Sequence, residues 1–213
     1  MVLKFVRLAA PFVFALCFSN QFAQAQADFD VHFGVGTAQA SSSGQAIDTF
    51  NTGNYLSTPK LVGTFGKVGA DIMLTPHFGI GGQADLRFSQ GSYAGLNYRP
   101  VFYDFNAIYA PLRADKRIVP EFQGGLGAVS LKFYYPQQYC DAFAGCSSSN
   151  TYLESSNHFQ VHMAAGVRFY LTPHLFIRPQ IDARYVNNFF QFGSNWVPEY
   201  SASVGWSFGS HER

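Results

Sequence analysis

The polar residues that could bind ions or take part in catalysis occur in a pattern that the chain contains twice. The segment 75–87 begins with Thr-Pro-His and ends with Gln-x-Asp-x-Arg, and the segment 172–184 repeats both motifs at the same spacing. The polar residues of the two copies are Gln83, Asp85, Arg87, Gln180, Asp182 and Arg184. In a β-strand, a spacing of two places each set on one face, opposite an apolar face. Such a row could form a selectivity ring for ions, or its charges could neutralise one another by pairing.

The elements that must position these residues are strands joined by turns. Alternation of apolar and polar residues predicts strands at 29–36, 61–74, from the first Thr-Pro-His turn to about 90, 98–112, 118–134, 158–171, 175–187 and 199–208. Long and short connections alternate, so an up-and-down barrel would have three short turns at one end and four longer loops at the other. We therefore predict an all-β fold, an eight-stranded antiparallel up-and-down barrel in which the two charged strands face each other.

The alternation changes phase once, within the fifth predicted strand. Phe122 and Leu126 lie on the apolar face, but Val129 and Leu131, at odd positions, are apolar as well. A change of phase by one residue predicts either a β-bulge near Ala128 or the exit of the strand from the barrel wall.

The composition indicates which face of the barrel is inside. Charged residues make up only 13% of the 213 residues, whereas aromatic residues reach 17%, with 23 Phe and 12 Tyr. This sparse charge is too little to coat a soluble barrel such as a lipocalin, whose apolar face points inward. Tyrosines near strand ends, Tyr98 and Tyr170 among them, are placed where membrane barrels carry interfacial girdles. The pattern favours a transmembrane barrel, and the net charge of +1 gives no reason to expect nucleic acid.

In a transmembrane barrel, the polar face lines the lumen. The predicted lumen charges are Asp30, Lys67, Asp71, Asp85, Arg87, Asp104, Glu121, Arg168, Arg178, Asp182 and Arg184. Eight strands leave an interior that side chains roughly fill, and charges are tolerated there when they are paired. We therefore expect a closed or barely conducting barrel, with a narrow channel for small solutes or ions as the alternative.

The N-terminal residues have the form of an export signal. Lys4 and Arg7 precede an apolar run at 8–18, and small-x-small cleavage sites follow at 23–25 and 25–27. We predict a cleaved secretory signal peptide, a barrel and a short C-terminal tail, at residues 1–27, 28–208 and 209–213.

Two long polar loops and two cysteines are the remaining features. Loops are expected at 39–60 and 135–157, and the second contains Cys140 and Cys146. An even pair of cysteines in an exported chain predicts a disulfide that closes a small loop. Because binding residues concentrate on loops, these two loops are the candidate contacts for an extracellular ligand. The segment 139–146 is either a recognition patch or a stabilising clip.

Together, these features resemble the small outer-membrane β-barrels of the OmpA/OmpX type, in the outer membrane protein β-barrel domain family. The resemblance covers residues 28–208, and the closing segment Gly205-Trp206-Ser207-Phe208 is similar to the aromatic end signal that the barrel assembly machinery recognises, although 209–213 follow it. The resemblance implies a location in the bacterial outer membrane, with outer-membrane lipids and the assembly machinery as partners. It also implies a non-enzymatic, structural role with external loops available for adhesion or ligand contact.

Three histidines share the polar face: His32, His158 and His162. They lack the spacing of metal ligands, so we predict no metal site and no cofactor. Some small outer-membrane barrels are lipid-modifying enzymes with a His-x-Ser pair, but here Gly, Gln and Ala occupy the position two residues after each histidine. We therefore predict no catalytic residues, and a lipid-modifying enzyme remains the second alternative.

Overall fold

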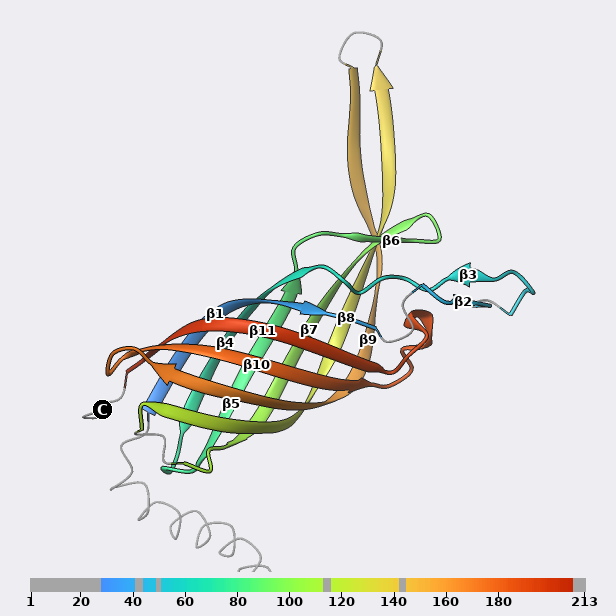
Figure 1. The fold of residues 1–213 in the computed structure, drawn as a ribbon. Helices are drawn as coiled ribbons and strands as arrows, with labels where there is room; N and C mark the ends of the chain where they lie inside the picture. The colour runs from blue at the N-terminus through green and yellow to red at the C-terminus, as the bar shows by residue number, and fades with distance from the viewer. Residues whose placement is uncertain (1–27, 41–43, 49–50, 113–115, 142–144, 209–213) are drawn as a thin grey trace, which may run out of the picture.

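The chain folds into a single antiparallel sheet that closes on itself as a barrel (Figure 1). A computed structural model describes residues 28–40, 44–48, 51–112, 116–141 and 145–208. The predicted signal peptide and the C-terminal tail lie outside the described residues. Within the described ranges, no helix is long and apolar enough to cross a membrane.

Eight strands form the barrel wall, and each pairs antiparallel with the next. They are β1 (Asp28–Ala38), β4 (Thr64–Met73), β5 (Phe78–Arg87), β7 (Leu96–Tyr109), β8 (Ile118–Asp141), β9 (Gly145–Tyr170), β10 (Leu175–Val186) and β11 (Trp196–Ser207). Pairing of β1 with β11 closes the ring. The prediction of an eight-stranded up-and-down barrel is confirmed.

The connections differ in length at the two ends of the barrel. The short connections, from β4 to β5, β7 to β8 and β9 to β10, lie at one end, which we call the short-turn end (Figure 1). The opposite, long-loop end carries the remaining connections. Its small elements are the hairpin of β2 (Ala46–Ile47) with β3 (Leu56–Ser57), the strand β6 (Gly91–Tyr93) and the 3-10 turn η1 (Phe190–Phe192).

The two Thr-Pro-His motifs form the same turn. In each copy the threonine Oγ1 accepts hydrogen bonds from two turn amides, at 3.3 and 2.9 Å for both Thr75 and Thr172. The Nδ1 atoms of His77 and His174 donate to a carbonyl at the adjacent strand end, at 2.9 and 3.0 Å. The threonine contacts depend on local sequence alone, whereas each histidine bonds a strand end 33 residues further along the chain.

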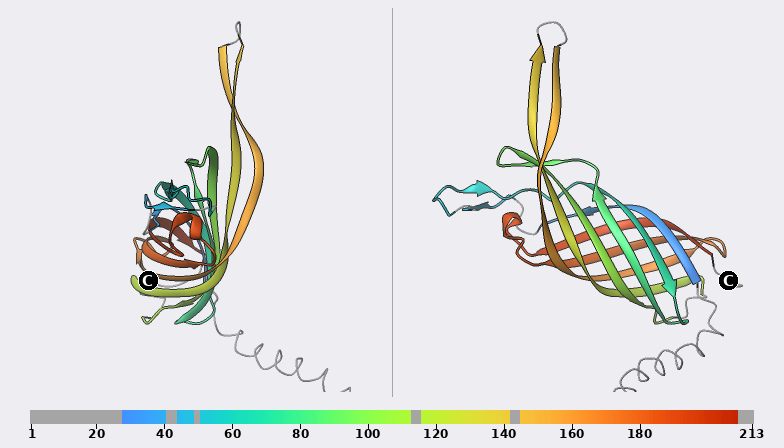
Figure 2. Two further views of the ribbon diagram at one scale, coloured as in Figure 1. Left: turned by 90° about the vertical axis from the view of Figure 1, so that its right-hand side faces the viewer. Right: turned by 180° about the vertical axis from the view of Figure 1, so that it is seen from behind.

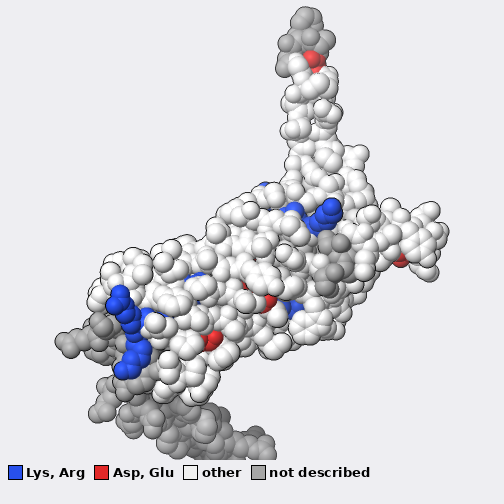
Figure 3. Space-filling model, viewed as in Figure 1, with Lys and Arg blue, Asp and Glu red and all other residues white. Residues whose placement is uncertain are grey.

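The outer face of the barrel is apolar and the inner face carries the charges. Phe105 is 74% exposed and Phe33 is 63% exposed, far more than a soluble core strand would allow. The space-filling view shows a barrel body with few charged atoms on its surface (Figure 3). The transmembrane orientation, rather than the lipocalin-like one, is confirmed.

The predicted loop at 135–157 is wrong, because both strands continue through it. β8 runs to Asp141 and β9 starts at Gly145, and the two stay paired to that point. They form a hairpin that extends well beyond the barrel (Figures 1 and 2). We call residues 135–141 and 145–153 the projecting hairpin. The polar composition of this segment suggested a loop, but its tyrosines and threonine favour extended backbone.

The phase change in β8 has a different cause from the predicted bulge. The pairing of β7 with β8 is unbroken past Ala128, and the register shift against β9 lies further along, between Phe133 and Tyr134. Val129 and Leu131 are fully buried, on the lumen side. The lumen face itself therefore becomes apolar toward the long-loop end.

Two apolar clusters close the ends of the lumen. The long-loop cluster contains Ala38, Ala40, Leu61, Phe65, Tyr98, Phe102, Val129, Leu131, Val186, Phe189, Phe192 and Val197. The short-turn cluster contains Met73, Ile108, Ala110, Val119, Tyr170 and Phe176. Tyr98 and Tyr170 are 1% and 3% exposed. Their assignment to interfacial girdles is wrong, because these rings point into the barrel and fill its ends.

Candidate functional site

The lumen between the two apolar clusters contains all eleven predicted charges. Each of these side chains is at most 6% exposed. Two acids that the sequence reasoning missed, Asp28 and Glu199, are buried with them, which gives eight carboxylates against five cations. Glu199 lies two and four residues before Ser201 and Ser203, so it shares their polar face of the strand. This spacing of two could have predicted that Glu199 faces the lumen.

The short-turn half of this network joins two arginines to three acids. Arg168 donates to Glu121 at 2.6 Å, to Asp71 at 2.9 Å and to Asp30. Arg178 donates to Asp71 at 2.7 Å and to Glu121 at 3.2 Å. Asp71 and Glu121 are shared by both guanidinium groups, whereas Asp30 pairs with Arg168, so removal of Arg168 would leave a buried carboxylate without its counter-charge.

In the central part of the lumen, Arg184 contacts three acids from three other strands. Its guanidinium donates to Asp104 at 3.1 Å and also to Asp85 and Glu199. The same group lies over the ring of Phe102, with 5.0 Å to the ring centroid. Arg184 therefore connects the charged centre to the long-loop cluster.

The two copies of Gln-x-Asp-x-Arg meet across the barrel. Gln83 Nε2 donates to Asp182 at 3.2 Å, and Gln180 Nε2 donates to Gln83 at 3.3 Å. Lys67 adds a 2.9 Å bond to Asp182 and ion pairs of 3.3 Å to Glu199 and 3.7 Å to Asp85. The repeated polar rows thus bind each other, as charge neutralisation requires.

Arg87 is the exception among the five cations. Its Nη1 and Nη2 atoms donate to the backbone carbonyls of Lys60 and Val62, at 3.0 and 2.8 Å. The guanidinium lies beside Tyr98, whose hydroxyl donates to the same Lys60 carbonyl at 2.5 Å. Arg87 therefore anchors the segment that leads into β4 instead of joining the central network.

Two of the three histidines take part in the network. Arg178 Nη2 donates to the imidazole of His32 at 2.7 Å, and His162 Nε2 lies 2.8 Å from an Asp182 oxygen. Across the described part of the chain, no group of three or more His, Cys, Asp or Glu side chains is arranged to hold a metal ion.

His158 makes its hydrogen bonds at the long-loop end, outside the charged network. Its Nδ1 lies 3.2 Å from the carbonyl of Asn187, which can only accept, so Nδ1 carries the proton. In the neutral imidazole, Nε2 then accepts from the Ser156 hydroxyl at 2.8 Å. Both ring nitrogens of this buried histidine are satisfied.

The lumen is therefore occupied along its length. Ion pairs fill its middle, and an apolar cluster fills each end. Eight-stranded barrels have interiors just wide enough for side chains, so this arrangement supports a plug more than a path for solutes.

The projecting hairpin presents the opposite environment, with side chains in solvent. Tyr135, Tyr139 and Tyr152 are 54%, 70% and 55% exposed. Near the tip, Cys140 and Cys146 are directly opposed across the two strands and form a disulfide. The bond clips the strands together where no neighbouring strand supports them.

Comparison with known proteins gives one family and a set of similar folds. The family model for the outer membrane protein beta-barrel domain matches residues 8–208. No curated protein sequence matches the chain.

Solved structures with this fold are outer-membrane proteins. OprG from Pseudomonas aeruginosa has a TM-score of 0.56 at 14% identity, over 86% of this chain and 96% of its own. Ail, the attachment invasion locus protein of Yersinia pestis, in complex with the heparin analogue sucrose octasulfate, has a TM-score of 0.52 at 14% identity, over 86% and 100%. Neisserial surface protein A has the same score and identity, over 86% and 98%. At these identities the likeness concerns the fold, and with the family match it indicates the bacterial outer membrane.

Proposed function

Because the chain belongs to the outer membrane protein beta-barrel family, we propose that it is a non-enzymatic barrel that holds a recognition arm outside the cell. The projecting hairpin is that arm. The observation that supports the proposal is that its two paired strands extend beyond the barrel into solvent (Figure 2). In membrane barrels the longer loops face outward and the short turns face the periplasm. The hairpin would then stand on the cell surface, and the plugged barrel would serve as its rigid base.

The side chains of the hairpin suit contact with another macromolecule. The segment 134–157 contains four Tyr and five Ser with Asn, Gln and Thr. Tyrosine supplies large contact area at low entropic cost, and Ser and Asn supply adaptable hydrogen bonds, a combination that binding loops of antibodies also use. The free edges of the two strands add backbone donors and acceptors for a partner strand.

The charge of the hairpin indicates the kind of partner. Residues 135–141 and 145–153 contain Asp141 but no Lys or Arg. Polysulfated ligands are bound chiefly through Lys and Arg, so the heparin analogue seen with Ail is not the ligand that this hairpin fits. We propose adhesion to a protein surface or to an uncharged glycan.

Adhesion of bacteria that display the protein tests this proposal. Cells of a Gram-negative host without its own adhesins would be counted on immobilised fibronectin, collagen and the uncharged glycan dextran. A shortened variant replaces residues 137–149 with Asn-Gly, which joins the paired residues Pro136 and Asn150 through a two-residue turn. We expect wild-type cells to adhere to at least one surface. Cells with the shortened variant should adhere to it in numbers at least about tenfold lower.

A triple tyrosine variant separates recognition from shape. Replacing Tyr135, Tyr139 and Tyr152 with Ser keeps the hairpin, and we expect most of the adhesion to be lost. A second variant, with Ser147, Ser148 and Ser149 replaced by Ala, removes hydrogen bonds but little contact area and should lose clearly less adhesion than the triple tyrosine variant. Absence of wild-type adhesion to all three surfaces would contradict the proposal, and steady single-channel conductance in planar bilayers would instead favour the narrow channel.

One contact favours a second candidate, a lipid-modifying enzyme. Ser156 Oγ lies 2.8 Å from His158 Nε2, the contact that a nucleophile makes with its base. The imidazole is oriented by a carbonyl in place of a carboxylate, and the pair also satisfies a buried histidine. Mass spectra of lipid A from an overexpressing strain decide between the two roles: a deacylated species that Ser156→Ala abolishes would establish the enzyme.

A further inference from the structure

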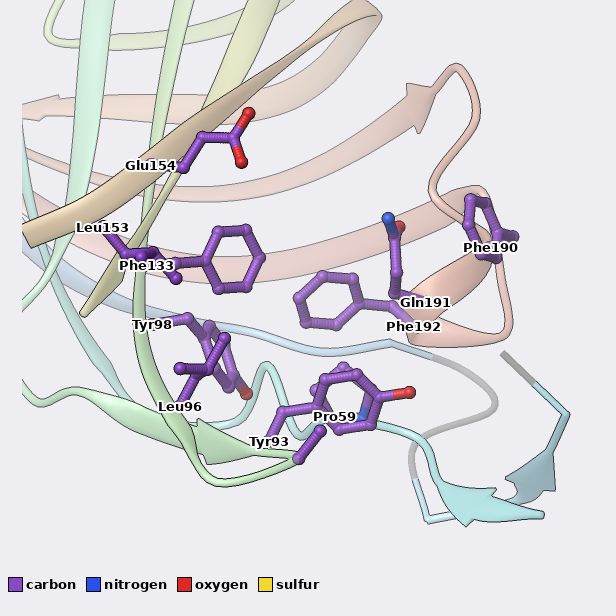
Figure 4. A pocket seen from close by; sticks show the side chains of 11 residues that line it. Pro59, Tyr93, Leu96, Tyr98, Phe133, Leu153, Glu154, Phe190, Gln191 and Phe192 are labelled. Carbon is purple, nitrogen blue, oxygen red and sulfur yellow. The ribbon is translucent and has the colours of Figure 1, made fainter. Parts of the chain in front are cut away.

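A pocket of about 290 Å³ lies at the base of the projecting hairpin, and neither the lumen network nor the proposed adhesion uses it. Its floor is the long-loop cluster, where the rings of Tyr98 and Phe192 meet edge to face with centroids 5.7 Å apart. Phe133 and Tyr93 also line the pocket, with their rings near those of Tyr98 and Phe192 (Figure 4). Four aromatic rings from β6, β7, β8 and η1 therefore enclose a space the size of a small molecule.

Two of the polar side chains that line the pocket offer hydrogen-bond acceptors, Glu154 and Gln191. Glu154 is directly opposite Phe133 in the pairing of β8 with β9, so both side chains project on the same side of the hairpin. The amide Oε1 of Gln191 is buried without a hydrogen-bond partner in the described part of the chain. In Figure 4 the polar ends of Glu154 and Gln191 lie on the same side of the Phe133 and Phe192 rings. The described residues that line the pocket include no Lys, Arg or His.

From this combination we infer that the pocket binds a small amphipathic organic cation, a primary or secondary ammonium group on an aromatic or short aliphatic body. Aromatic faces carry negative charge density and attract ammonium groups. The Glu154 carboxylate would accept a charge-assisted hydrogen bond from the N–H, and the Gln191 oxygen could accept another. The apolar body would pack on Tyr98 and Phe192.

A neighbouring hollow supports the sign of the charge. It shares Pro59, Tyr93, Ala94 and Tyr98 with the pocket but lies against the cations Lys60 and Arg87. The wall that contains Tyr93 and Tyr98 thus separates an acidic side from a basic side. An anion would prefer the basic side, so it should not respond to a change at Glu154.

Calorimetric titration of the full chain in lipid nanodiscs tests this inference. The lipid is phosphatidylglycerol, because ethanolamine headgroups carry a primary ammonium and would compete, and the signal of protein-free nanodiscs is subtracted because this anionic lipid itself attracts an ammonium probe. The probes are 2-phenylethylammonium, its neutral isostere 2-phenylethanol and the anion 3-phenylpropionate, at pH 7. We expect the ammonium to bind at least about five times more tightly than the alcohol, and the affinity of the anion to be unchanged by Glu154→Gln.

Substitutions locate the binding at the pocket. Glu154→Gln should weaken ammonium binding about three- to tenfold and leave the alcohol unchanged, whereas Phe133→Ala should weaken both. Asp141→Asn removes the same charge at the tip of the hairpin and should change neither. Barrel folding of every variant is verified by the gel shift on heating. Equal affinity for the three probes, an unchanged affinity in Glu154→Gln, or an equal loss in Asp141→Asn would overturn the inference.

Discussion

The two copies of Gln-x-Asp-x-Arg have the same sequence pattern but end in different environments. Arg184 is fully buried among three carboxylates, whereas Arg87 donates to backbone carbonyls beside Tyr98. The neighbouring strand of each hairpin explains the difference. The residues opposite the two arginines are Phe65 on β4 and His162 on β9, so the first copy runs into the apolar long-loop cluster and the second stays in the polar centre.

The aspartates of the two copies differ for the same reason. Asp85 is opposite Lys67 in its hairpin, whereas Asp182 is opposite Ala164. Lys67 reaches across the lumen to Asp182 as well, so one lysine serves both copies. The repeated motif therefore determines which face of each strand is polar. The residues opposite the motif on neighbouring strands determine which contacts its polar side chains make.

The largest effect should come from the arginine of the second copy. Arg184→Ala would leave Asp85, Asp104 and Glu199 buried with fewer counter-charges, and we expect a loss of about 3–5 kcal/mol in the free energy of unfolding. Urea titration in lipid vesicles, followed by the gel shift of the folded barrel, measures it. Arg117→Ala, at an exposed arginine of the short-turn end, is the control and should remain within about 0.5 kcal/mol of wild type. A loss below about 1 kcal/mol for Arg184→Ala would show that the network contributes little.

A smaller effect is expected for the arginine of the first copy. Arg87→Ala removes hydrogen bonds to the carbonyls of Lys60 and Val62, and the expected loss is about 1–3 kcal/mol because no buried carboxylate is left unpaired. The same urea titration measures it. If Arg87→Ala and Arg184→Ala destabilised the barrel equally, the distinction between the two copies would fail.

The smallest effects should be equal in the two copies. Thr75→Ala and Thr172→Ala each remove the side chain that accepts from two turn amides, at a cost of about 0.5–1.5 kcal/mol. Because the two turns have the same geometry and lie far apart, the losses should match and should add in the double variant. Unequal losses, or a double variant that deviates from the sum by more than about 0.5 kcal/mol, would contradict local control of the turns.

Several parts of this barrel follow from the sequence because they depend on near neighbours in the chain. Alternation with a period of two identified the eight strands and the face that carries Asp30, Lys67 and the other charges. Chain order then determined that the charged strands oppose each other. The turn geometry of Thr-Pro-His is equally local.

Other features depended on closure of the sheet. Near a barrel end, an apolar residue is compatible with either face, which is why Tyr98 and Tyr170 were assigned to the membrane side. The polar composition of 135–157 similarly predicted a loop, although the segment forms a hairpin whose strands are held by pairing and by the disulfide.

The sequence by itself determined the fold class, the inside-out polarity and eleven of the charged residues that line the lumen, because strand periodicity is a property of consecutive residues. Tertiary structure alone decided which charges pair, that Glu199 joins Arg184 and Lys67, and that an aromatic pocket with one carboxylate forms below the hairpin. These contacts join residues far apart in the chain, 138 positions for Asp30 and Arg168, and they exist only once the register of all eight strands brings them within a few ångströms.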